Sequence, residues 1–186
     1  MGIDVGLKTF ATLSTGQAVA NPRFFRQEER ALARVQRAHS KLTKGTPERA
    51  KHRKVVARVH ERIAWRRSDF SHQHSRRIVN TFDLLAVEDL SVNRMTHNHC
   101  LAKSIHDTAW SQFTALLAYT AAWAGRQYVA VNPAYTSQDC SRCGHRQTLS
   151  LADRLYACPC CGLVLDRYRN ASLNILRLGQ QSLASA

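Results

Sequence analysis

The alternation of apolar and polar residues near the start of the chain predicts a strand. Residues 2–13 alternate, with Ile3 and Val5 on one face and Asp4 on the other, as in a half-buried strand. A turn and a meander of short strands through about Asn21 are expected to follow. A small sheet is therefore predicted at this end of the chain.

The next part of the chain has helical periodicity. Apolar residues recur at helical spacing over 24–44 and again over 48–80, and Gly45-Thr46-Pro47 interrupts the pattern. Two amphipathic helices joined by a short break are predicted. The residues expected to face inward are Leu32, Val35, Leu42, Val55, Val56, Val59 and Ile63.

The second half of the chain predicts a mixture of strands and helices. A short apolar run over 82–87 has the length of a buried strand and places Glu88 at its carboxyl end. The remaining expected elements are a loop over 93–103, a helix over 110–121 closed by Gly125, a strand over 128–131 and a last helix over 170–178.

Charge changes the picture of the helical segment. The net charge is +14, and residues 23–77 hold 17 Lys/Arg against 5 Asp/Glu. Such a surface favours polyanions, because each neutralised phosphate releases counterions; the alternative is a solvated helical face. Nucleic acid is the expected partner. The predicted contact residues are Arg34, Arg37, Lys41, Arg58, Arg62 and Arg66.

The chain has no sequence feature typical of a membrane or exported protein. No uninterrupted apolar run approaches the length of a membrane span, and Met1 is followed directly by the first strand pattern. We expect a soluble protein that makes no membrane contact and lies in the prokaryotic cytoplasm, associated with the nucleoid when it is bound to DNA.

Four of the six cysteines form two Cys-x-x-Cys-Gly motifs, Cys140/Cys143 and Cys158/Cys161, separated by 14 residues. Four thiolates fill a tetrahedral shell, so this pattern predicts a structural zinc ion rather than a catalytic one. Two redox-active pairs are the alternative. Cys160 competes with Cys161 for the metal, but the repeated register and the following glycine favour Cys161.

Three carboxylates from distant segments are candidate catalytic residues: Asp4, Glu88 and Asp166. Taken alone, Asp4 is more often an exposed strand residue than a ligand. Together the three would suit Mg²⁺ or Mn²⁺, which prefer oxygen ligands and assist phosphodiester cleavage. Spacing alone leaves their convergence open.

Several segments together resemble the TnpB (OrfB) family of transposon-associated proteins. Residues 2–8 and 84–90 resemble its first two RuvC motifs, 132–138 its entry into a zinc ribbon, and 170–176 the helix after its third motif. The resemblance implies an α/β, RNase H-like (RuvC-like) fold with a mixed sheet, a basic helical hairpin and an inserted zinc ribbon. It also implies metal-dependent DNA endonuclease chemistry, with DNA and a guide RNA as partners.

The resemblance also implies a division of the chain. Residues 1–131 would form the nuclease core with the basic hairpin over 23–80, residues 132–165 the zinc ribbon, and residues 166–186 the last motif and helix. Family members usually carry a substantial N-terminal region that holds the guide RNA. We therefore expect a missing N-terminal domain or partner chain.

The third motif departs from the family pattern. The family typically reads Asp-Arg-Asp-x-Asn-Ala, whereas this chain has Asp166-Arg-Tyr168-Arg-Asn-Ala, with Tyr168 at the catalytic position. A neutral phenol is a poor Mg²⁺ ligand. The main hypothesis is thus a nucleic-acid-binding protein with impaired cleavage. The alternative is an active nuclease using Asp4, Glu88 and Asp166, and a zinc-ribbon interaction module would leave the RuvC motifs unexplained.

Overall fold

The N-terminal segment forms three strands in the computed structural model, which describes residues 1–150 and 152–185. The strands are β1 (Gly2–Val5), β2 (Thr9–Leu13) and β3 (Ala18–Ala20). Strand β2 pairs antiparallel with both β1 and β3. The prediction of one strand over 2–13 is wrong. The chain reverses at residues 6–8, where the Gly6 N–H donates to the Phe10 carbonyl at 3.2 Å, and the alternation changes phase at Thr9 and Phe10.

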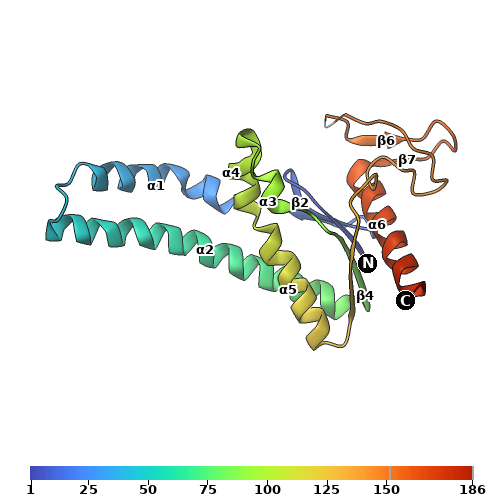
Figure 1. Cartoon of the computed structure of the whole chain (residues 1–186), viewed down its shortest axis with the longest axis horizontal. Coiled ribbons are helices and arrows are strands. Elements are labelled where there is room, and N and C mark those ends of the chain that lie inside the picture. Colours follow the sequence, from blue (N-terminus) through green and yellow to red (C-terminus); the bar gives the residue numbers. More distant parts are fainter. Residues whose placement is uncertain (151, 186) are drawn as a thin grey trace.

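Two further strands complete a mixed five-stranded sheet of order β3-β2-β1-β4-β5. Strand β4 (Leu84–Glu88) runs parallel to both β1 and β5 (Gln127–Val131) (Figure 1). These are the two strands expected from the short apolar runs. Parallel strands end at the same edge of a sheet, so the ends of β1 and β4 lie together.

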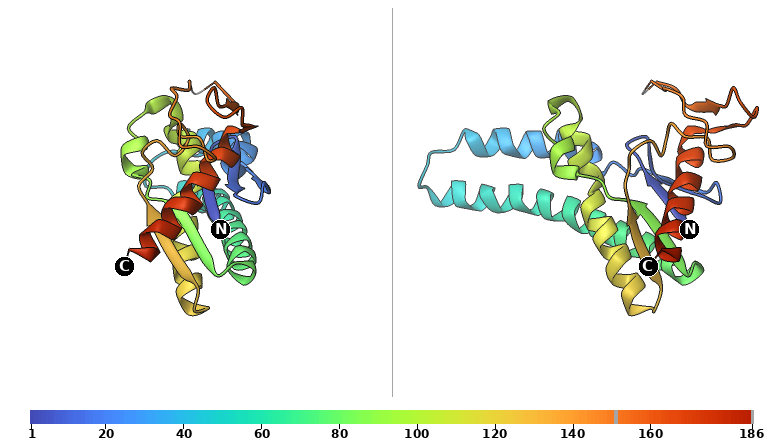
Figure 2. Two further views of the ribbon diagram at one scale, coloured as in Figure 1. Left: turned by 90° about the vertical axis from the view of Figure 1, so that its right-hand side faces the viewer. Right: turned by 45° about the vertical axis from the view of Figure 1, so that its right-hand side comes forward.

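A long helical hairpin extends away from the sheet (Figures 1 and 2). It consists of α1 (Phe24–Ser40) and α2 (Pro47–Thr81), as the two periodic segments predict, and Thr46 caps α2 by accepting the Arg49 N–H at 3.3 Å. Val55 was expected to face inward but is 40% exposed. Its position on α2 lies about a quarter turn from the row formed by Val56, Val59 and Ile63, which packs against Leu32 of α1.

The segment predicted as a loop over 93–103 is helical instead. It forms α3 (Val92–Met95) and the first half of α4 (His99–Thr108), with the Asn98 side chain accepting the Cys100 N–H. Helix α4 is anchored by Ile105, which is buried in the main core, and by a polar contact. Asp107 accepts the Phe25 N–H at 2.8 Å and pairs with Arg67 at 3.0 Å, which joins α4 to both hairpin helices.

The two faces of the sheet are covered by different helices. Helices α2 and α5 (Trp110–Trp123) pack on the face that presents Ile3, Leu85 and Val87, where the main core lies. Helix α5 is followed by Gly125 at a φ of 64°, as predicted. Helix α6 (Arg167–Ala184), which begins three residues before the predicted start, covers the opposite face (Figure 2).

Helix α6 approaches the sheet closely because two contact positions are glycine. A Cβ on Gly2 would lie 1.9 Å from the Ser172 carbonyl oxygen, and one on Gly179 would lie 2.5 Å from the Ala86 Cβ. Only residues without a side chain fit at these positions. The close packing places the amino end of α6 beside the carboxyl ends of β1 and β4.

A small separate unit precedes α6. It contains the antiparallel pair β6 (Leu155–Ala157) and β7 (Val164–Asp166), packed around Tyr156 and the cysteines. Two residues lie outside the described part of the chain: Leu151, which falls within the predicted zinc ribbon, and Ala186, the last residue. None of the described helices is long and apolar enough to cross a membrane.

Candidate functional site

Two of the predicted catalytic carboxylates meet at one edge of the sheet. Gly2 and Ile3 of β1 pair with Ala86 and Val87 of β4, so the next positions along these parallel strands are Asp4 and Glu88. Both side chains belong to the row that faces α6, since alternate residues of a strand share a face. The sequence motifs and the strand register thus bring the two carboxylates together.

Burial makes this pair electrostatically unfavourable without a cation. Asp4 is only 8% exposed, so the expectation of an exposed strand residue is wrong. Burial raises the pKa of Asp4 well above its ordinary value, and the neighbouring Glu88 carboxylate raises it further. Burial also raises the pKa of Glu88, although a hydrogen bond from Thr136 opposes this shift. A buried and a half-buried acid that resist ionisation form a site suited to positive charge.

The third predicted carboxylate has a structural role at the start of α6. Asp166 caps this helix, with its Oδ1 accepting the N–H groups of Tyr168 at 2.9 Å and Arg169 at 3.2 Å. It also lies near enough to contribute to the raised pKa of Asp4. Within residues 1–150 and 152–185, however, the three acids do not form a compact group of ligand atoms, and only the cysteines do.

Tyr168 lies in the cleft beside the acidic pair. Its ring carbon Cε1 is 3.6 Å from the place that a Cβ on Gly6 would occupy, next to the end of β1. Its hydroxyl accepts a hydrogen bond from Nη1 of Arg154 at 2.6 Å. The Tyr168 side chain is therefore held in place by a residue of the cysteine-containing unit.

This cleft has a volume of about 1000 Å³ and is lined by both signs of charge. Asp4 and Glu88 lie in its wall, and Asp107 is already paired with Arg67. The basic residues around it are Lys8, Arg23, Arg26, Arg154 and Arg167. The excess of positive charge suits a phosphodiester strand.

A chain of hydrogen bonds connects the cysteine-containing unit to the acidic pair. The hydroxyl of Thr136, which is 4% exposed, donates to Oε1 of Glu88. The Asn174 side chain donates to the carbonyl oxygens of Thr136 at 2.9 Å and Asp139 at 2.7 Å. Asn170 adds a bond to Asp139 at 2.8 Å.

These connections were not foreseen from the sequence. Thr136 lies in the segment that resembles the entry to a zinc ribbon, but its residue type gives no signal of contact with Glu88. The same is true of Arg154, whose partner is 14 residues away. Only the fold brings these side chains to the carboxylates.

The four predicted cysteines converge. The Sγ atoms of Cys140, Cys143, Cys158 and Cys161 all lie within 4.8 Å of one another, and two of the separations are 3.6 Å. A tetrahedral zinc ion with Zn–S bonds of about 2.3 Å would require separations of about 3.8 Å. The donor set and its spacing therefore fit one tetrahedral metal ion.

The two cysteine turns share the same backbone geometry. The N–H groups of Gly144 and Gly162 donate to the carbonyls of Cys140 and Cys158, with φ angles of 77° and 69° at the glycines. Both glycines thus adopt the left-handed conformation expected from the repeated motif. Cys160 is exposed and is not one of the four converging residues.

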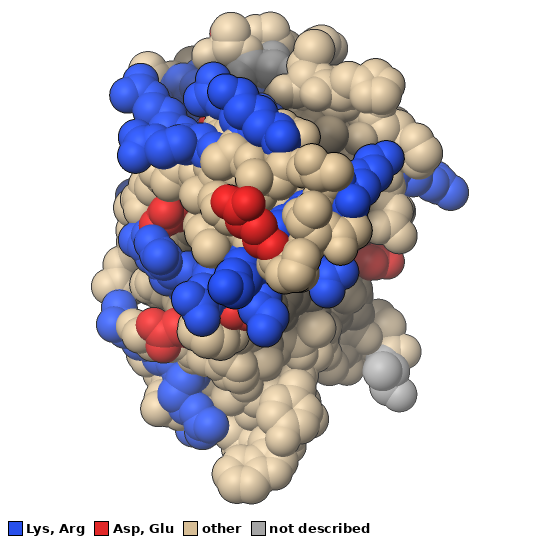
Figure 3. Space-filling view, turned by 90° about the vertical axis from the view of Figure 1, so that its left-hand side faces the viewer, with Lys and Arg blue, Asp and Glu red and all other residues tan. Residues whose placement is uncertain are grey.

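The helical hairpin presents most of the predicted nucleic-acid contacts to solvent. Figure 3 views the molecule from the hairpin tip, where Lys and Arg side chains gather with few acidic ones. Four of the predicted contact residues are exposed and form no ion pair within the described part of the chain: Arg34, Arg37, Lys41 and Arg58.

Arg66 differs from the other predicted contact residues. It donates to the Gln27 side chain at 2.9 Å, and its guanidinium lies 4.7 Å from the centre of the Phe24 ring. Arg62 and Arg66 each lie 3.6 Å from Glu28. Arg66 thus joins α2 to α1, and Arg62 is partly engaged in the same way.

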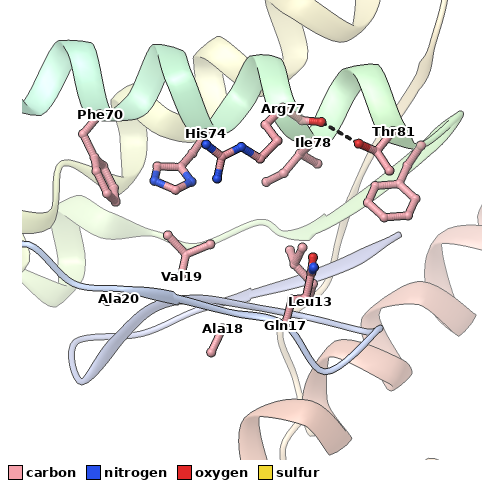
Figure 4. A pocket seen from close by; sticks show the side chains of 11 residues that line it. Leu13, Gln17, Ala18, Val19, Ala20, Phe70, His74, Arg77, Ile78 and Thr81 are labelled. Carbon is pink, nitrogen blue, oxygen red and sulfur yellow. Dashed lines mark hydrogen bonds between the residues drawn. The ribbon is translucent and has the colours of Figure 1, made fainter.

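A second pocket lies between α2 and the edge of the sheet at β2 and β3 (Figure 4). Its volume is about 540 Å³, and Leu13, Val19, Phe70 and Ile78 are among its lining residues. None of the predicted site residues lines it. The acidic cleft remains the candidate site.

Family profiles match both halves of the chain. Residues 1–99 match the profile described as a probable transposase (OrfB, IS605), and residues 110–175 match the Cas12f1-like TNB domain. Together these matches include the acidic pair, the hairpin and the cysteine cluster.

Individual relatives match over nearly the whole chain. A putative RNA-guided DNA endonuclease from Streptomyces pristinaespiralis is 41% identical, covering 96% of this chain and 45% of the relative. The putative RNA-guided DNA endonuclease InsQ from Escherichia coli (strain K12) is 32% identical, covering 99% of this chain and 50% of the relative. The chain spans about half the length of these relatives.

The fold is similar to that of a solved structure. A cryo-EM structure of a Cas12f1–sgRNA–target DNA complex contains a chain with a TM-score of 0.68 and 17% identity. The match covers 94% of this chain and 48% of the other. The likeness shows a shared mixed α/β architecture.

Proposed function

Because the chain belongs to the OrfB family of probable transposases, and its relatives include putative RNA-guided DNA endonucleases, we propose that it binds nucleic acid and has lost most of its DNA cleavage. Its fold would be RNase H-like (RuvC-like), with the hairpin and the cysteine unit as additions to a nuclease core. Its partners would be DNA and the guide RNA named for the family.

One observation carries this proposal. Asp4 and Glu88 lie at the ends of adjacent strands and have raised pKa values, as a cation-binding pair would. Tyr168 lines the same cleft. A phenol is a poorer ligand for Mg²⁺ than a carboxylate, which is the oxygen ligand this ion prefers. Two carboxylates alone hold a pair of divalent ions weakly, so cleavage should be slow.

The residues of this site would have three roles: metal binding, orientation of a metal ligand and contact with phosphates. Asp4 and Glu88 would hold Mg²⁺ or Mn²⁺, which when bound activates water and neutralises charge on the phosphate. Thr136 would orient the Glu88 carboxylate through its hydrogen bond. Arg154 and Arg167 would contact phosphates of the strand in the cleft.

The cysteine cluster would hold a structural zinc ion. Four thiolates leave no open coordination position, so the ion would stabilise the fold and take no part in cleavage. Through Asn170 and Asn174, the zinc-bound unit would be fixed against α6 and hence beside the acidic pair.

The second candidate function is an active nuclease with Asp166 as the third metal ligand. It is favoured by one observation, the contribution of Asp166 to the raised pKa of Asp4. Its disadvantage is that Oδ1 of Asp166 already accepts two N–H groups at the start of α6. A metal ion would compete with this cap.

Cleavage of single-stranded DNA tests the proposal. The purified chain would be incubated with Mg²⁺ or Mn²⁺ beside an Asp4→Ala variant, and binding to the same DNA would be measured in parallel. We expect binding by both proteins and little cleavage by either. Robust cleavage that disappears in the Asp4→Ala variant would establish the active nuclease, and absence of binding would reject the proposed function.

A further inference from the structure

Helix α2 presents a basic stripe on its outer surface. Lys51, Lys54 and Arg58 follow one another at spacings of three and four residues, so they lie along one side of the helix. All three are exposed, and none has an ion-pair partner in the part of the chain that the structure describes. The stripe is therefore a row of unneutralised charges directed into solvent.

The same side of the helix continues through the exposed Glu61 to an exposed tryptophan. Trp65 lies seven residues after Arg58, which returns to the same side of the helix after two turns. It is 70% exposed, whereas Val59 and Ile63 on the other side of α2 are 7% and 3% exposed. The indole thus has no part in the hairpin core, and its face is available to a ligand.

The rows on the two sides of α2 have different chemistry. Towards α1 the helix uses Val59, Ile63 and Arg66 to hold the hairpin together. Away from α1, the distance from Lys51 to Trp65 is about 21 Å at 1.5 Å per residue. Cationic side chains leading to a flat aromatic ring match the two elements of an unpaired nucleic-acid strand, its phosphates and its exposed bases.

A duplex would use only part of this surface. Its phosphates would pair with the lysine and arginine side chains, but its bases are stacked on each other and present no free face to an indole on a helix surface. An unpaired strand offers both. The charge of the stripe also disfavours a second copy of this +14 chain as the occupant.

We propose that the outer stripe of α2 is a binding site for unpaired nucleic acid, in which Lys51, Lys54 and Arg58 contact the backbone and Trp65 stacks on a base. This inference rests on the proposed nucleic-acid-binding function and specifies the strand form that the hairpin prefers. It assigns a role to Trp65, a residue outside the predicted contacts.

The full chain would be titrated against a fluorescein-labelled single strand and a duplex of the same length and sequence. Trp65→Ala should weaken single-strand binding about fivefold or more, the effect of removing one stacking aromatic. Duplex binding should not change. Trp65→Tyr should keep single-strand affinity within about twofold, because a phenol ring also stacks.

Two further measurements separate stacking from a general effect. The slope of log K against log salt should be the same for the parent and Trp65→Ala, because stacking releases no counterions. In a Trp123→Phe background, Trp65 is the exposed tryptophan that remains, since Trp110 is 3% exposed. Single-stranded nucleic acid should quench its fluorescence more strongly than duplex does.

Trp123→Ala is the matched control, because Trp123 is 78% exposed on α5, a helix without charged residues. Its affinity for the single strand should equal that of the parent. Equal losses on single strand and duplex for Trp65→Ala, or no loss from a parent that binds, would overturn this inference alone. A parent that binds neither polymer would overturn the proposed function as well.

Discussion

The hydroxyl group of Thr136 donates a hydrogen bond to the Oε1 atom of Glu88. Thr136 belongs to the segment that leads into the cysteine cluster, and Glu88 ends a strand of the main sheet. The bond thus connects the two candidate metal sites of the molecule. It also supplies the one interaction that lowers the pKa of a carboxyl group whose pKa is raised by burial.

Replacement of Thr136 should weaken metal binding at the acidic pair. Thr136→Val removes the donor and keeps the shape, so we expect Mn²⁺ affinity to fall about tenfold, as for other residues that orient a metal ligand. Thr136→Ser should retain the parent affinity. Electron paramagnetic resonance of free Mn²⁺ measures this directly, with exposed Thr148→Val as the control. Unchanged Mn²⁺ affinity in Thr136→Val would show that Glu88 is oriented without this bond.

The cysteine prediction came from sequence because the chemistry is local. Each pair of cysteines and its glycine form one turn, and the structure brings the four Sγ atoms together as expected. The hairpin was likewise visible in the periodicity of α1 and α2. In both cases, residues close in sequence determine the geometry.

Errors arose where distant residues decide the structure. Helix α4 is held by contacts of Asp107 with Phe25 and Arg67, and no local pattern reveals them. The break between β1 and β2 shows only as a change of phase at Thr9 and Phe10, and both faces of the sheet are covered, so burial does not follow the expected pattern at Asp4. The contacts of Thr136 and Arg154 are of the same long-range kind.

Loss of one cluster cysteine should remove the zinc. Elemental analysis should find about one zinc ion per chain in the parent and much less in Cys143→Ser or Cys161→Ser, since three thiolates leave an incomplete shell. Cys160→Ser is the matched control and should retain the metal, because Cys160 lies outside the converging group. Full zinc in Cys161→Ser would transfer the ligand role to Cys160.

Neutralising Asp4 should stabilise the metal-free protein. The pKa of Asp4 is raised in the folded state, so its ionisation costs folding free energy that is absent below the unfolded pKa, grows as pH rises towards the folded pKa and is fully present above it. Asp4→Asn should therefore raise the free energy of unfolding at pH 8, and raise it by less at pH 5. Denaturant titration without divalent ions measures both values. A gain that is larger at pH 5 would contradict the argument.

Arg58 and Arg66 should respond differently to the same substitution. Arg58→Gln removes an exposed cation and should flatten the slope of log K against log salt by about one unit. Arg66→Gln should leave the slope nearly unchanged and cost about 0.5–1 kcal/mol of stability, because this side chain packs on Phe24. Salt titrations and thermal unfolding of both variants provide the comparison. Equal slopes in both variants would mean that Arg66 leaves its hairpin contacts to bind phosphate.

The last prediction concerns Tyr168. Tyr168→Asp would place a carboxylate at the amino end of α6, beside Asp4 and Glu88, and would supply the negative charge that two divalent ions require. We expect cleavage of single-stranded DNA with Mn²⁺ to rise at least about tenfold over the parent. Tyr168→Phe is the control for loss of the hydroxyl and should not cleave faster than the parent.

Arg154 should limit the increase in cleavage that Tyr168→Asp produces. In the parent it donates to the Tyr168 hydroxyl, and after Tyr168→Asp it would lie within reach of the new carboxylate and compete with the metal. Adding Arg154→Gln should therefore increase Mn²⁺ affinity in the Tyr168→Asp background and have little effect in the parent. Asp166→Asn in the parent should keep the cap of α6, because asparagine caps a helix about as well as aspartate, and should leave cleavage unchanged. If the parent already cleaves and Asp166→Asn abolishes that activity, Asp166 is the third ligand and the protein is a working nuclease.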